Sequence, residues 1–78
     1  MDEMVRIFVM PVEGGWSVDC ALIAMPLMFL SGARAEEKAR ALGVFLSGLG
    51  SDARVLVHDR QRALIGTAHY FAPDSAAT

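Results

Sequence analysis

The stretch Gly14-Gly15-Trp16 decides the fold, because it separates two segments in which apolar residues recur at alternate positions. Glycine readily adopts the positive φ angles of tight turns, so the pair predicts a β-hairpin. Its strands would run from Met4 to Met10 and from Trp16 to Cys20. Both faces of the first strand are largely apolar, so we expect neither face to be plain solvent surface.

A short third strand is expected from Pro26 to Leu30, after a loop. Proline has no amide hydrogen for a ladder, so Pro26 belongs at the start of a strand or on a sheet edge. A helix should then begin near Ser31 or Gly32, where the serine can cap it, and end near Gly50.

The expected helix has an apolar stripe at spacings of three and four residues, which can cover a sheet. The stripe comprises Ala35, Ala39, Leu42, Leu46 and Leu49, with Phe45 beside it. We expect Trp16 to close the sheet against the region of Leu42, Phe45 and Leu46. Glu36 and Arg40 are four residues apart and should pair on the solvated face of the helix.

A second hairpin is expected from segments 54–58 and 63–70. If His58 pairs with Ala63, Leu56 and Ile65 point away from the core face. The predicted fold is α+β: an antiparallel sheet of about five strands, in the order βββαββ, packed on one face by a single helix. We expect one domain over residues 1–71 and a flexible C-terminal tail over residues 72–78.

The composition predicts more apolar surface than so small a core can bury. Of the 78 residues, 54% are hydrophobic, and the mean hydropathy is +0.39. The uncharged stretch between Asp19 and Arg34 is shorter than the roughly 20 residues of a membrane-spanning helix, so we expect no membrane association. Cys20 is the single cysteine, and the start of the chain carries Asp2 and Glu3, which favours a cytoplasmic protein.

Few residues suggest catalysis. His58 and Asp59 are adjacent, but neighbouring strand residues point to opposite faces, and aspartate commonly opens turns. His58 and His69 lack nearby acidic or thiol companions for a metal, and Cys20 shares the apolar face of its strand. We therefore expect no enzyme activity, no metal and no cofactor.

The charge pattern does not suggest nucleic-acid binding. The formal net charge is -2, and the basic residues are scattered along the chain, with only Arg60 and Arg62 close together. Proteins that bind nucleic acids usually concentrate positive charge on one face, so we expect no nucleic-acid partner.

The chain resembles a family of small bacterial domains of unknown function. Three segments carry the resemblance, namely Gly14-Gly15-Trp16-Ser17-Val18, Ala35-Glu36-Glu37-Lys38-Ala39-Arg40 and Val55-Leu56-Val57-His58-Asp59. Members usually have glycine in the final turn, where this chain has Arg60-Gln61-Arg62. The resemblance implies no activity.

The first half is also similar to HicB-type antitoxins, through Gly14-Gly15-Trp16 and Glu36-Glu37. Those proteins bind and inhibit a small RNA-cleaving toxin. The chain lacks their usual proline-aspartate-leucine-proline-glycine segment, and residues 21–26 take its place.

The function expected from the sequence is therefore non-catalytic: a homodimerising or protein-binding module, with a HicB-like antitoxin as the alternative. The candidate interface residues are apolar side chains on the strand faces that the helix does not cover: Met4, Phe8, Met10, Leu56 and Ile65.

Overall fold

The computed structural model describes residues 4–73, which form five strands and one helix in the expected order. The elements are β1 (Val5–Val12), β2 (Gly15–Cys20), β3 (Leu27–Phe29), α1 (Gly32–Gly48), β4 (Ala53–His58) and β5 (Leu64–Tyr70). The α+β class and the βββαββ succession are thus confirmed.

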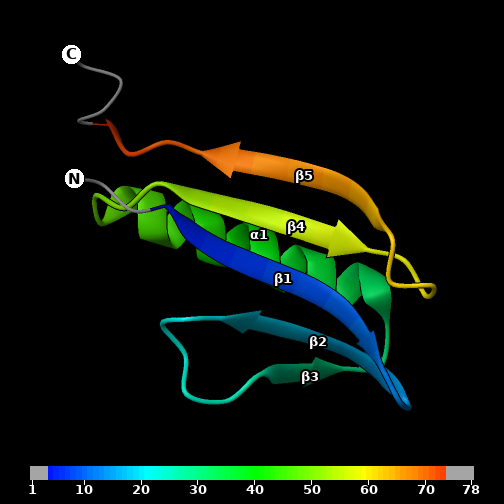
Figure 1. The fold of residues 1–78 in the computed structure, drawn as a ribbon. Helices are drawn as coiled ribbons and strands as arrows, with labels where there is room; N and C mark the ends of the chain where they lie inside the picture. Colours follow the sequence, from blue (N-terminus) through cyan, green and yellow to red (C-terminus); the bar gives the residue numbers. More distant parts are fainter. Residues whose placement is uncertain (1–3, 74–78) are drawn as a thin grey trace.

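The five strands form one sheet in the order β3-β2-β1-β4-β5 (Figure 1). β1 and β4 run parallel, whereas the other neighbours are antiparallel, so the prediction of a wholly antiparallel sheet is wrong on this point. The reason is the path of α1. The helix carries the chain back along the sheet, so β4 starts at the same end as β1 and joins its free side.

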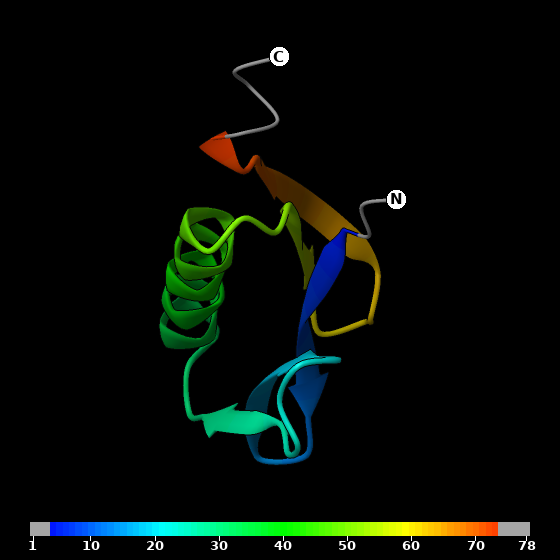
Figure 2. The same ribbon diagram turned by 90° about the vertical axis from the view of Figure 1, so that its left-hand side faces the viewer.

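The core lies between α1 and one face of the sheet, and within residues 4–73 no helix covers the opposite face (Figure 2). The sheet contributes its largest fully buried side chains there: Ile7, Val9, Val18 and Val55. α1 contributes Ala35 and Ala39, which are fully buried and allow the helix to approach closely. Cys20 is buried in the same cluster, as expected.

Both ends of α1 follow the sequence signals. The Ser31 side chain accepts a hydrogen bond from the Arg34 amide at 3.1 Å and caps the first turn. At the other end Gly50 has a φ of 100°, and the amides of Gly50 and Ser51 donate to the carbonyls of Ser47 and Leu46. These two bonds form a Schellman motif, in which glycine supplies the left-handed residue.

The buried stripe of α1 differs from the predicted one at its C-terminal end. Phe45 and Leu49 are exposed, and Gly43 is buried instead. A Cβ on Gly43 would lie 2.5 Å from Cδ2 of Tyr70, so the glycine leaves the space that the Tyr70 ring occupies. The buried arc of the helix is therefore rotated towards β5.

Trp16 packs at the start of α1, and the predicted contact with the Leu42–Leu46 region is wrong. A Cβ on Gly32 would lie 3.1 Å from the indole, which places the ring directly under the first helical turn. The guanidinium of Arg60 lies 5.0 Å from the centre of the ring. Trp16 thus joins β2, the start of α1 and the turn between β4 and β5.

The second hairpin has a different register from the expected one. Val57 pairs with Gly66 and His58 with Leu64, so Ile65 is the extra residue of a β-bulge. Because of the bulge, Leu64 shares a face with His58, and Ile65 does not share a face with Leu56 as predicted.

The predicted tail begins at Ala72, but this residue is anchored. Ala72 is buried, and its amide donates to the Asp52 carboxylate at 2.8 Å. The rest of the expected tail, from residue 74 onwards, lies outside the described residues.

Candidate functional site

The His58-Asp59 pair does not form a catalytic dyad. Asp59 Oδ1 accepts hydrogen bonds from the amides of Gln61 and Ala63, at 2.9 and 3.0 Å, and so holds the turn. His58 Nδ1 lies 3.1 Å from the carbonyl oxygen of Val9 and donates to it. Each side chain is engaged with backbone, as the turn interpretation predicts.

The two histidines lie apart along the second hairpin. Arg54 pairs with His69, and His58 is four residues further along β4, which separates the histidines by about 13 Å. Among residues 4–73 no group of three or more His, Cys, Asp or Glu side chains could hold a metal ion.

Most of the candidate interface residues lie on the face of the sheet away from α1, which we call the open face. Phe8 pairs with Leu56 across β1 and β4, and the two differ in exposure: 38% for Phe8 and 9% for Leu56. Met4 and Met10 precede and follow Phe8 on the same side and are half-buried. The open face is therefore apolar at its centre, where Leu56 is buried and Phe8 stays exposed.

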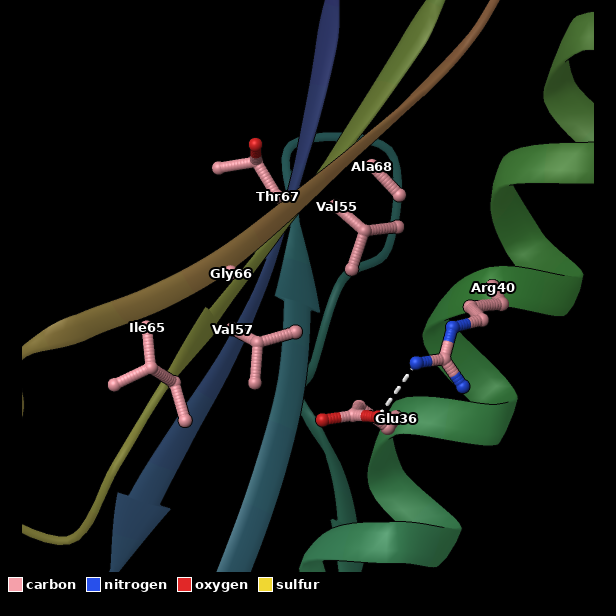
Figure 3. A pocket seen from close by; sticks show the side chains of 8 residues that line it. All are labelled: Glu36, Arg40, Val55, Val57, Ile65, Gly66, Thr67 and Ala68. Carbon is pink, nitrogen blue, oxygen red and sulfur yellow. Dashed lines mark hydrogen bonds and ion pairs between the residues drawn. The ribbon is translucent and has the colours of Figure 1, made fainter.

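Ile65 lies elsewhere, beside a groove between β5 and α1 (Figure 3). The groove has a volume of about 140 Å³ and an apolar floor that includes Val55, Val57 and Ala68. Gly66 also lines it, and a Cβ at that position would meet nothing within 4 Å. One helix cannot cover all five strands, so a hollow is left along β5.

Charged and polar groups border this groove. Arg40 donates to Glu36 across 2.7 Å, which confirms the predicted pair, and both residues line the groove together with Thr67 (Figure 3). The pair was expected on a solvated helix face. In the folded chain the pair also lies beside β5, because α1 packs along that side of the sheet.

β5 forms one edge of the sheet, and apart from the bulge at Ile65 its sequence has little of the usual protection of an edge. The strand LIGTAHY contains no proline, lysine or acidic residue. Leu64 and Ile65 at its start and Phe71 after its end are exposed. β3, the other edge, is only three residues long and follows Pro26, so it is protected by its shortness.

A row of basic side chains that was not predicted from the sequence crosses the open face: Arg6, Arg54 and His69. Arg6 pairs with Arg54 across β1 and β4, and Arg54 pairs with His69 across β4 and β5. These residues are far apart in the sequence. Each strand contributes one member, and the row depends on the parallel β1–β4 pairing, which was not predicted.

Among residues 4–73, no helix has the length and apolar character that crossing a membrane requires. No protein-family model, curated protein or solved structure matches the chain. The resemblances to the Gly-Gly-Trp domains and to HicB-type antitoxins therefore stay predictions.

Proposed function

We propose that the protein is a non-catalytic homodimerising module of the cytoplasm, and that two chains associate through their β5 edges. The observation that carries the proposal is a seven-residue edge strand that contains no proline, lysine or acidic residue and has exposed apolar side chains at both ends. Backbone groups on such an edge can pair with a second strand, and two copies of β5 could extend the sheet from one chain into the other. The buried free thiol of Cys20 is in keeping with a reducing compartment.

The groove beside β5 favours a defined homodimer over non-specific pairing of exposed sheet edges. Ile65 is 63% exposed, and the adjacent Gly66 leaves a hollow on the helix side of the same edge. In an antiparallel pair of β5 strands, the Ile65 side chain of one copy can lie over the hollow of the other. An edge contact of this kind buries less than a standard interface, so we expect a dissociation constant in the micromolar range.

Sedimentation equilibrium between about 1 and 100 µM tests the proposal, with three variants that each add one charge. Ile65→Lys should make the protein monomeric, because the charge would lie within the contact. Val44→Lys is the matched control: Val44 is 60% exposed, on the outer face of α1, and its replacement should leave the dimer intact.

Phe8→Lys distinguishes the β5 edge from the open face. If Phe8→Lys abolishes association and Ile65→Lys does not, the dimer forms through the open face and the edge proposal is wrong. A wild-type chain that is monomeric over the whole concentration range would refute homodimerisation altogether. Leu56 is unsuitable for this test, because a charge at so buried a position would unfold the sheet.

A further inference from the structure

We propose that the open face binds a segment of single-stranded nucleic acid, with a phosphate held between Arg6 and Arg54 and a base stacked on Phe8. This function is separate from dimerisation. The three residues lie on β1 and β4, whereas the proposed dimer contact lies on β5.

The two arginines are direct neighbours on adjacent parallel strands. Paired strands lie about 4.8 Å apart, and like charges directly opposite each other destabilise a sheet. Within residues 4–73 neither arginine forms an ion pair with a carboxylate. An anion between them would relieve this repulsion, and two guanidinium groups suit the several oxygens of a phosphate.

Arg54 is held in position from its other side. Its Nε donates a hydrogen bond to Nε2 of His69. The two terminal nitrogens of the guanidinium, Nη1 and Nη2, can then donate to a ligand. His69 in turn contacts Phe71 edge to face, with the ring centres 5.5 Å apart. This sequence of contacts orients the guanidinium before any ligand binds, so less conformational entropy is lost on binding.

Phe8 supplies the aromatic surface that favours nucleic acid over other phosphate ligands. It follows Arg6 on the same face of β1, two residues or about 7 Å along the strand. Phe8 is 38% exposed, although its neighbour Leu56 is buried. Single-stranded nucleic acids commonly bind sheet surfaces in this way, with bases stacked on aromatic rings and phosphates on basic side chains.

The remaining basic residues of the second hairpin are not part of this site. Arg60 stacks over Trp16, and Arg62 Nη1 lies 3.5 Å from the carbonyl oxygen of Pro11. Two fixed charges imply weak binding that depends on salt. For a single strand with one phosphate neutralised, the slope of log K against log salt concentration should be about -0.7.

Fluorescence anisotropy with a labelled oligouridine of about eight nucleotides tests the proposal between about 20 and 200 mM salt. Arg6→Ala should weaken binding about tenfold at low salt and make the salt slope shallower. Arg34→Ala is the matched control, because it removes the same charge from an exposed position on α1 and should change neither quantity.

Phe8→Leu tests the stacking, since it keeps apolar volume but removes the aromatic ring. It should weaken binding several-fold and leave the salt slope unchanged. Circular dichroism must show that each variant keeps the wild-type fold. Equal losses for Arg6→Ala and Arg34→Ala, or no binding of oligouridine at the lowest salt, would overturn the proposal.

Two further probes test the class of ligand. A duplex of the same length should bind more weakly than the single strand, because its bases are not free to stack on Phe8. An acidic peptide of equal charge should also bind more weakly. If either probe binds as tightly as oligouridine, the site is a general anion patch and the assignment to single-stranded nucleic acid is wrong.

Discussion

Gly43 shows how one missing side chain determines the position of the helix on the sheet. Glycine inside a helix costs about 1 kcal/mol relative to alanine, and the sequence alone marks Gly43 and Gly48 as equivalent weak points. The structure separates them: Gly43 is buried beneath the ring of Tyr70, whereas Gly48 faces open space.

Alanine substitutions at these two glycines should therefore have opposite effects. Gly43→Ala should lower the free energy of unfolding by about 1–2 kcal/mol, because the new methyl group displaces Tyr70 by more than the gain in helix propensity offsets. Gly48→Ala should raise it by about 0.5 kcal/mol, since the site is free of neighbours and lies at the end of the helix. Urea denaturation measures both, and equal effects would show that Tyr70 does not pack against Gly43.

Among the elements, the β4–β5 hairpin departs most from the sequence-based expectation. Its turn places Arg62 at a φ of 67°, a left-handed conformation that costs a residue with a Cβ about 1 kcal/mol. Asp59 stabilises this turn by accepting two amide hydrogen bonds. The turn and the bulge together shift the register, and that shift brings Ile65 to the edge groove.

Arg62→Gly should stabilise the hairpin, because glycine adopts the left-handed conformation without steric cost. We expect the free energy of unfolding to rise by about 0.5–1 kcal/mol, even though the long contact between Arg62 and Pro11 is lost. Gln61→Gly is the control: Gln61 does not have a positive φ, so that variant should be less stable than wild type. Thermal unfolding of both variants provides the measurement, and a destabilised Arg62→Gly variant would contradict the strain argument.

How much could be predicted from the sequence also depends on the element. The first hairpin, the helix ends and the strand succession follow from local signals such as Gly14, Ser31 and Gly50, which act within a few residues. The parallel pairing of β1 with β4 and the bulge at Ile65 depend on contacts between distant segments. The groove and the basic row are consequences of those contacts, so no local pattern could have predicted them.

At the scale of the whole molecule, a single helix on a five-stranded sheet leaves two surfaces available for partners. One is the β5 edge with its groove, and the other is the open face with Arg6, Phe8 and Arg54. The two are distinct, since the groove lies on the helix side of the sheet. Pairing through β5 would place two open faces side by side, so dimerisation would double the length of sheet offered to a bound strand.

Dimerisation should also make the stability of the molecule depend on its concentration. A domain of this size has little stability to spare, and association of folded chains stabilises them by mass action. Raising the concentration from about 1 to 100 µM should therefore raise the Tm of the wild-type chain by about 3–5 °C. The Tm of Ile65→Lys should not change over that range, whereas Val44→Lys should behave as wild type. Differential scanning calorimetry at several concentrations measures the effect, and a wild-type Tm that does not depend on concentration would show that folding gains nothing from a second copy.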